Sequence, residues 1–172
     1  LGSRGLGDVY KRQVLRVRSP RGEREVPIAQ WYKGVGKVDL AHEELLVKIV
    51  IPRANCEGYT GHYIKYAMRS AMDIATLGVS CLVKLSADKR TVEEARLAFG
   101  VAGPVPIRAC GAEAAVRGLP IGEAVGRIGR AALEDVHPRS SWRASKEFRL
   151  QLVEELSGRA LREAARKGGA QI

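Results

Sequence analysis

At 172 residues, with 45% apolar and 28% charged residues, the chain is long enough for one well-buried domain and has the composition of a globular protein. Its formal net charge of +10 suggests a nucleic-acid partner, but basic residues are spread along the whole chain and aromatic residues make up only 5%, so we expect no such partner. No apolar run is long enough to cross a membrane and no secretory signal opens the chain, so we expect no membrane span and a cytoplasmic location.

Residues 1–13 differ from the rest of the chain. They begin without methionine, include three glycines and show no apolar periodicity. The segment resembles a translated adapter sequence, so we exclude it from the prediction of the fold. On this interpretation the native sequence upstream of residue 14 is missing and the chain is a fragment.

The next segment has the pattern of strands. Short alternating runs at residues 14–18 and 24–28 flank a Ser-Pro-Arg-Gly turn and predict a strand pair. Residues 31–37 are expected to form a glycine-rich loop, because their Gly-x-Gly-Lys sequence lacks the other residues of a phosphate-binding loop. The β-branched apolar run at residues 45–51 ends at Pro52 and predicts a buried strand.

A polar connector at residues 53–61 is the expected boundary between two units. Beyond it, residues 63–68 alternate between polar and apolar, and residues 75–85 are apolar. Residues 94–101 alternate again after a charged turn at residues 88–90. We therefore predict three further strands in this part of the chain.

The last third of the chain has helical periodicity. Helices are predicted over residues 107–117, 121–136 and 144–167, with stops at glycine or proline. Glycine recurs at every fourth position, at Gly118, Gly122 and Gly126. This spacing predicts close helix packing. Strands followed by helices predict an α+β fold, in which a small antiparallel sheet of three to four strands carries about three helices on one face.

The residues that most often carry chemistry are scattered. The three cysteines are widely spaced and have no histidine at ligand spacing, so we expect no metal site within this chain. They are Cys56, Cys81 and Cys110. The three histidines have no acid or nucleophile at a suggestive offset, so we expect no catalytic residue among them. They are His42, His62 and His137.

Residues 65–78 combine three charged residues with an apolar continuation. Composition alone predicts an ion pair between Arg69 and Asp73 at a strand edge. The Arg-x-x-x-Asp-Ile-Ala pattern at residues 69–75 also resembles a signature of the FAD-binding medium subunit of molybdenum hydroxylases, near the start of its C-terminal domain. This family includes xanthine dehydrogenase and carbon monoxide dehydrogenase.

Three further segments are similar to the same family. Residues 40–52 resemble the last stretch of its FAD domain, with a Glu-x-Leu core and a closing proline. Residues 97–108 contain its Phe-Gly-x-x-x-x-x-Pro-x-Arg pattern, and residues 140–149 contain its Arg-x-Ser-x-x-Phe-Arg helix start. The four matches follow the family's order over about residues 24–168.

The resemblance implies a domain organisation. Residues 14–58 would be the C-terminal tail of a FAD-binding domain, and residues 59–172 would be the CO dehydrogenase flavoprotein C-terminal domain. The family's two glycine-rich loops, which hold the FAD pyrophosphate, belong to an N-terminal half that this sequence does not contain. We therefore expect this chain by itself to hold no FAD and to be inactive.

The resemblance also implies an electron-transfer role. The chain would be part of an oxidoreductase subunit that passes electrons from iron–sulfur clusters through FAD to an acceptor such as NAD. The implied partners are an iron–sulfur subunit with 2Fe–2S clusters and a molybdopterin subunit. Two residues would contact the flavin: Leu46 would lie against it, and Lys65 would bring a cation to it.

Other interpretations remain open. On the residues alone, Leu46 is an ordinary strand-core residue and Lys65 a solvated strand residue. The C-terminal domain could instead be a non-catalytic module for subunit docking. Trp142 and Arg143 would then form a contact patch, although Trp142 is equally compatible with a core position at a helix start. A basic nucleic-acid-binding module is the weakest alternative.

Overall fold

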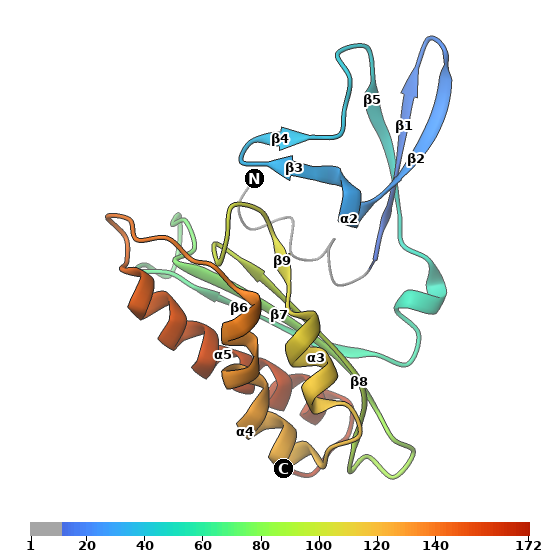
Figure 1. Ribbon diagram of the computed structural model, residues 1–172. Coiled ribbons are helices and arrows are strands. Elements are labelled where there is room, and N and C mark those ends of the chain that lie inside the picture. Colours follow the sequence, from blue (N-terminus) through green and yellow to red (C-terminus); the bar gives the residue numbers. More distant parts are fainter. Residues whose placement is uncertain (1–11) are drawn as a thin grey trace.

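The structure is a computed structural model that describes residues 12–172, so most of the segment interpreted as an adapter lies outside the described residues. The chain forms two units joined by one linker (Figure 1). We call the first the N-terminal β unit, residues 14–50, and the second the C-terminal unit, residues 60–167.

The N-terminal β unit contains a three-stranded antiparallel sheet in the order β2-β1-β5. Its strands are β1 (Val14–Ser19), β2 (Gly22–Pro27) and β5 (Leu45–Val50). The alternation of β1 buries Leu15 and Val17, which pack with Val26, Ile28 and Trp31 in a small core. The predicted strand pair at residues 14–18 and 24–28 is therefore confirmed.

The predicted loop at residues 31–37 is wrong in part. A short helix α2 (Ile28–Trp31) leads into the two-stranded ladder of β3 (Tyr32–Gly34) and β4 (Lys37–Val38). Gly36 has a φ of 68°, a conformation that glycine adopts without steric cost, and this allows the tight reversal between the two strands.

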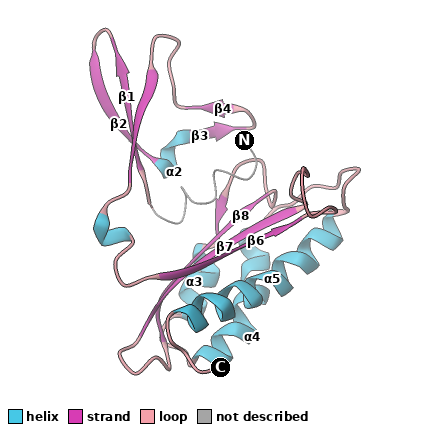
Figure 2. Cartoon of the chain, turned by 180° about the vertical axis from the view of Figure 1, so that it is seen from behind, coloured by secondary structure: helices cyan, strands magenta, loops and turns pink. Residues whose placement is uncertain are grey.

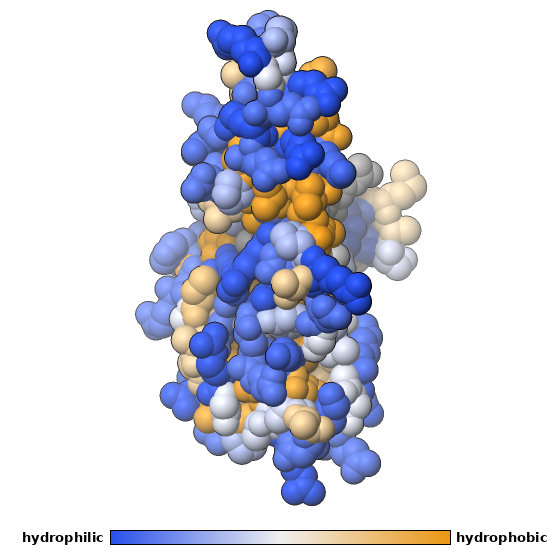
Figure 3. All heavy atoms as spheres, turned by 90° about the vertical axis from the view of Figure 1, so that its right-hand side faces the viewer, coloured by the Kyte–Doolittle hydropathy of each residue, from blue (hydrophilic) through white to orange (hydrophobic). Residues whose placement is uncertain are grey.

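Strand β5 is not buried as predicted. Apart from the half-buried Val50, its apolar side chains are exposed, from 41% at Leu46 to 71% at Leu45, and those of Val47 and Ile49 fall between these values. Apolar surface is visible on the upper unit among charged side chains (Figure 3). The apolar run does form a strand, but no described element covers it.

The C-terminal unit contains a four-stranded antiparallel sheet in the order β6-β7-β8-β9. Its strands are β6 (Thr60–Tyr66), β7 (Leu77–Leu85), β8 (Val92–Gly100) and β9 (Ile107–Arg108). Strand β9 occupies the start of the predicted helix at residues 107–117. A two-residue strand gives too short a run for the alternating pattern to be recognised.

Three helices cover one face of this sheet, as Figure 2 shows from behind. They are α3 (Cys110–Val116), α4 (Ile121–Ala132) and α5 (Lys146–Lys167). The main core lies between them and the sheet, around Leu77, Phe99, Ile128 and Leu161. The predicted α+β fold, with about three helices on one face of a small antiparallel sheet, is confirmed.

Glycines bring α4 and α5 into close contact, but not those predicted. A Cβ atom on Gly129 would lie 1.9 Å from the Glu154 carbonyl oxygen, and one on Gly158 would lie 2.8 Å from that of Val125. Gly122 and Gly126 instead face open space, and Gly118 ends a turn with a φ of 77°. The predicted packing role of the Gly118, Gly122 and Gly126 repeat is therefore wrong.

Within residues 12–172, none of the helices is long and apolar enough to cross a membrane.

Candidate functional site

The C-terminal sheet has a second face, turned away from the helices, that carries small side chains. Residues paired directly across strands share a face, so the register defines two adjacent rows on it. One row is Lys65, Gly78 and Gly100, and the other is Tyr63, Ser80 and Ala98. We call this the small-residue face.

The rim of the small-residue face is accessible, whereas its centre is not. Ser80 and Ala98 are 2% and 0% exposed, but Tyr63 is 41% exposed and Lys65 is also exposed. Both rim residues belong to β6, the edge strand. The N-terminal β unit lies on this side of the sheet, opposite the helices (Figure 1). A ligand at the rim would therefore meet an ammonium group beside a phenol ring.

Lys65 is held in place by the loop that follows β6. Its Nζ donates a hydrogen bond of 2.6 Å to the carbonyl oxygen of Asp73, so the loop folds back toward the strand. The ammonium group of Lys65 is thus anchored by one hydrogen bond while its side chain stays exposed.

Asp73 organises this loop through the backbone. Its carboxylate accepts hydrogen bonds from the backbone N–H groups of Arg69 at 3.0 Å and Ile74 at 2.8 Å. Burial is the largest single effect and would raise the pKa of Asp73. The hydrogen bonds from Arg69 and Ile74, together with the nearby Arg69 charge and the Met68 backbone, outweigh burial and lower the pKa.

The predicted ion pair between Arg69 and Asp73 does not form between their side chains. The Arg69 guanidinium donates instead to the carbonyl oxygen of Met72 at 2.9 Å. The Asp73 carboxylate binds two backbone N–H groups in preference to the Arg69 guanidinium. Backbone donors are already ordered, whereas a long arginine side chain would lose conformational entropy on pairing. Arg69 and Asp73 both bind the backbone of the loop next to Lys65. They therefore have a structural role, as predicted, but through hydrogen bonds to the backbone and not through an ion pair with each other.

Leu46 lies on β5 in the N-terminal β unit, paired with Val17 and 41% exposed. Its exposure rules out the strand-core interpretation. Leu46 and Lys65 belong to different sheets, and the structure does not bring them together.

Sequence reasoning missed Tyr63, which lies beside Lys65 at the rim. The signal was present, because residues two apart on a strand share a face. The alternation that predicted a strand at residues 63–68 therefore also places Tyr63 next to Lys65.

Arg108 belongs to the opposite edge of the same sheet. Its Nε and Nη2 each donate a 2.7 Å hydrogen bond to Glu113 of α3, whose Oε1 also accepts the backbone N–H of Leu97. Burial would lower the pKa of Arg108, but the Glu113 carboxylate outweighs burial and raises it. This partly buried pair fastens β9 to α3 and is structural.

A cavity of about 500 Å³ separates the two units near Arg108. Its walls come from the start of β1, from α2 and from the turn between β9 and α3. Two of its lining residues, Arg12 and Gln13, belong to the segment interpreted as an adapter. We therefore assign no ligand to this cavity.

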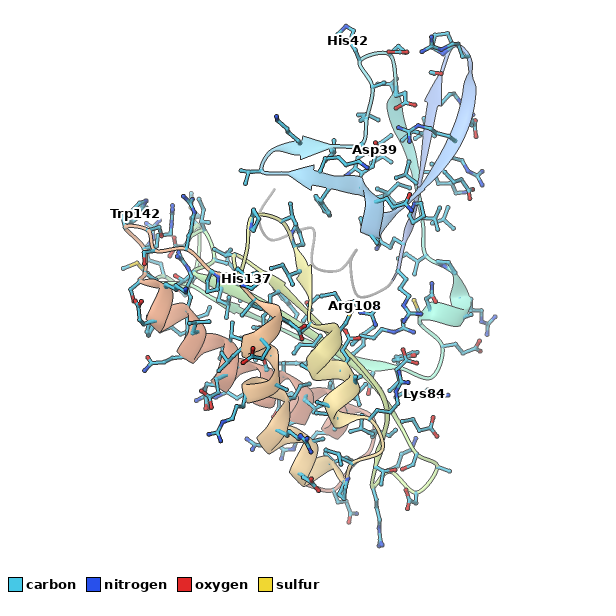
Figure 4. The ribbon with its side chains drawn as sticks, in the orientation of Figure 1. Asp39, His42, Lys84, Arg108, His137 and Trp142 are labelled. Carbon is cyan, nitrogen blue, oxygen red and sulfur yellow. The ribbon has the colours of Figure 1, made fainter. Side chains whose placement is uncertain are left out.

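Trp142 lies on the surface near the start of α5 and is 80% exposed (Figure 4). The Arg143 guanidinium lies over its ring, 4.0 Å from the ring centroid. The core position considered for Trp142 is therefore wrong. An exposed tryptophan stacked on an arginine has the composition of a protein contact site.

A family model and the sequences of known relatives assign this chain to the same family. The CO dehydrogenase flavoprotein C-terminal domain matches residues 62–164. The xanthine dehydrogenase FAD-binding subunit of Escherichia coli O157:H7 is 43% identical over 159 residues, which are 92% of this chain and 54% of that protein. The glyceraldehyde dehydrogenase medium chain of Sulfolobus acidocaldarius is 30% identical over 153 residues, 88% of this chain and 53% of that protein.

Solved structures show the same fold. Carbon monoxide dehydrogenase from Hydrogenophaga pseudoflava matches with a TM-score of 0.85 at 27% identity, over 97% of this chain and 58% of that chain. Quinoline 2-oxidoreductase from Pseudomonas putida 86 also has a TM-score of 0.85, with 22% identity over 97% of this chain and 58% of that chain. The present chain spans about half the length of the relatives that it matches.

Proposed function

Because this chain belongs to the family of FAD-binding subunits of molybdenum hydroxylases and forms their C-terminal part, we propose that it serves a xanthine dehydrogenase-like enzyme as part of the flavin site. The whole subunit would relay electrons from iron–sulfur clusters through FAD to an acceptor such as NAD. The observation that carries this proposal is the 43% identity with a xanthine dehydrogenase FAD-binding subunit over nearly the whole chain.

The partners in this proposal are an iron–sulfur subunit with 2Fe–2S clusters and a molybdopterin subunit, working in the cytoplasm. FAD, when bound, supplies the redox chemistry, and this chain supplies position and charge. The two glycine-rich loops of the proposed FAD site are not among the 172 residues. This chain would therefore form only one wall of the site and would be inactive by itself.

The rim of the small-residue face has the right chemistry for a flavin. Lys65 offers an anchored, exposed cation, and Tyr63 offers an aromatic ring on the same face. A reduced flavin is anionic, so a fixed cation nearby stabilises it relative to the oxidised form. Leu46 would contact another part of the elongated cofactor through its exposed apolar side chain.

The intact FAD-binding subunit that contains this sequence provides the test. We expect Lys65→Met to weaken FAD binding or to lower the flavin midpoint potential, the latter by on the order of 20 mV, since the reduced anion loses a nearby charge. Fluorescence titration would measure the FAD dissociation constant, and a spectroelectrochemical titration the potential.

Lys84→Met is the matched control. Lys84 is an exposed lysine on the same sheet and pairs with Glu93 (Figure 4). It lies six residues along β7 from Gly78, the partner of Lys65. Both variants remove one positive charge, so a general charge effect would appear in both. If Lys65→Met left the FAD dissociation constant and the potential unchanged, the role assigned to Lys65 would be wrong.

A docking role is the alternative function, and the exposed Trp142 with its stacked Arg143 supports it. In that case the C-terminal unit would bind the iron–sulfur or molybdopterin subunit and would have little influence on the flavin.

A further inference from the structure

The orientation of the two units depends on the linker between them. The linker, residues 51–59, includes a short 3-10 helix (Arg53–Asn55) and ends where β6 begins. Among the elements that the structure describes, none in the N-terminal β unit packs extensively against an element of the C-terminal unit. Whatever fixes the linker therefore largely fixes the angle between the units.

A buried arginine of the C-terminal sheet holds this linker. Arg96 on β8 is 3% exposed, and it pairs with Leu82 on the face of the sheet that turns away from the helices. Its Nη1 donates a 2.7 Å hydrogen bond to the carbonyl oxygen of Asn55, and its Nη2 donates one of 2.7 Å to the hydroxyl of Tyr59. The guanidinium also lies over the Tyr59 ring, 4.2 Å from the centroid.

The same guanidinium is neutralised within the sheet. Arg96 Nε donates a 2.9 Å hydrogen bond to the Glu94 carboxylate, which also interacts with Tyr59. Burial raises the pKa of Tyr59, and the neighbouring Glu94 raises it further, so the tyrosine hydroxyl stays neutral at physiological pH. The tyrosine hydroxyl therefore remains available as an acceptor for Arg96.

The linker is costly to release from this network. A buried guanidinium is stable only while its donors are paired, and hydrogen bonds from a charged donor are stronger than neutral ones. Moving the linker away would remove one carbonyl acceptor, one hydroxyl acceptor and one aromatic ring from Arg96. A surface arginine could move into solvent after such a loss, but one that is 3% exposed cannot do so without opening the structure.

We propose that Arg96 is a positioning residue that clamps the linker through Asn55 and Tyr59 and thereby sets the angle between the N-terminal β unit and the C-terminal sheet. This inference rests on the proposed function in one respect: the FAD site lies between the two units, so a change in their angle changes the site. Arg96 itself touches no cofactor in this scheme.

The test uses the intact FAD-binding subunit with Arg96→Met, which removes the charge and all donors at similar length. Tyr59→Phe is a milder second variant that removes one acceptor and keeps the ring. Arg159→Met is the control, because Arg159 is exposed on α5 and pairs only with nearby Glu155 among the described contacts.

Two measurements are made on each protein. Fluorophores at positions 21 and 162, attached through non-natural amino acids so that Cys56 and Cys110 stay unlabelled, report the distribution of distances between the units by energy transfer. Fluorescence titration gives the FAD dissociation constant. The first readout senses orientation directly, and the second senses its effect on the cofactor site.

We expect Arg96→Met to broaden the distance distribution and to raise the FAD dissociation constant about tenfold, as it would if the competent orientation fell to about a tenth of the population. Tyr59→Phe should change both in the same direction but less, and Arg159→Met should change neither. If Arg96→Met does not fold, Tyr59→Phe alone decides the outcome.

Unchanged distance distributions in the folded Arg96 and Tyr59 variants would overturn the clamp. A broadened distribution without weaker FAD binding would overturn its role at the cofactor site. If the unsubstituted subunit bound no FAD, the proposed function would fail instead, and the distance measurement would still decide whether Arg96 positions the units.

Discussion

A three-residue charge cluster secures the loop that precedes β5. Arg24 donates two 2.7 Å hydrogen bonds to Glu44, one of 2.9 Å to the Asp39 carboxylate and one of 2.8 Å to the Asp39 carbonyl oxygen. Glu44 also accepts the backbone N–H of Ala41 at 2.8 Å. These contacts lower the pKa of Glu44 from 4.5 to about 2, with the hydrogen bond from Arg24 as the largest cause and the one from Ala41 next. These hydrogen bonds connect β2 with the loop that precedes β5.

The lowered pKa of Glu44 predicts a pH dependence of stability. A folded-state pKa below the unfolded one contributes stability that is fully present above about pH 4.5 and is lost as the pH falls toward about 2. We therefore expect Glu44→Gln to lower the urea midpoint at pH 7 and to have a much smaller effect at pH 2.5.

Glu57→Gln serves as a control, because Glu57 is exposed and its ion pair with Arg53 lies within the linker. Equal destabilisation by Glu44→Gln at both pH values would contradict the assignment. Unfolding of the N-terminal β unit is followed through Trp31, which is buried in its core.

At the residue scale, the sequence predicted that three charged residues lie together, but it did not predict the groups to which they bind. Lys65, Arg69 and Asp73 do gather at one loop, but Asp73 binds backbone N–H groups, and these are invisible in a pattern of side chains. Arg96 was missed because one arginine in an alternating strand gives no sign of what lies opposite.

At the scale of helices, Gly129 of α4 lies directly against the backbone of α5. A Cβ atom there would overlap the backbone of Glu154, which cannot move aside as a flexible side chain would. Gly126 lies on the same helix, one turn earlier, with open space around its Cα atom. A side chain therefore cannot be accommodated at Gly129 but can be at Gly126.

This contrast gives a paired prediction. Gly129→Ala should destabilise the protein by about 1–3 kcal/mol through overpacking. Gly126→Ala should stabilise it by up to ~1 kcal/mol, since alanine favours the helix and meets no neighbour. Urea denaturation followed by circular dichroism measures both, and a loss of stability in Gly126→Ala would contradict the open environment assigned to it.

Most elements could be predicted from periodicity, and the exceptions share a cause. Strands β6, β7 and β8 and helices α4 and α5 are long enough to show their pattern. Strands β3, β4 and β9 have two or three residues each, which is too short a run for an alternating pattern to be recognised. The sequence also gave no reason for β5 to be exposed.

At the scale of the whole molecule, the exposed Trp142 and Arg143 predict a contact with another subunit. In the assembled enzyme, we expect Trp142→Ala with Arg143→Ala to reduce co-purification of the partner subunits several-fold, because aromatic and arginine side chains dominate interface energies. FAD content should be unchanged, since neither residue is among those assigned to the flavin site.

Phe148→Ala is a useful comparison, because Phe148 is at the same end of α5 but packs against Tyr66 within the chain. It should affect stability more than assembly. If the Trp142 and Arg143 substitutions left the complex intact, the docking role would have to be placed elsewhere on the surface.

The candidate site could be predicted only in part from the sequence. The resemblance directed attention to Leu46 and Lys65, but only the register of β6, β7 and β8 shows that Lys65 shares a face with Tyr63 and with small residues. In the proposed clamp, the relation between the two units depends on Arg96, which is 41 residues from Asn55 and 37 from Tyr59 in the sequence, and none of the three belongs to a motif.

The two ends of the C-terminal unit meet in space. Thr60 donates a 2.8 Å hydrogen bond from its hydroxyl to the carbonyl oxygen of Ala164, and Lys167 donates one of 3.1 Å to that of Gly61. The first strand and the last helix are thus fastened where they begin and end. A circularly permuted form, with these ends joined by a short peptide and the chain opened at the exposed turn at residues 87–90, would keep every strand pairing of the sheet. The unit could also be inserted into a loop of another protein without separating the two ends of that loop.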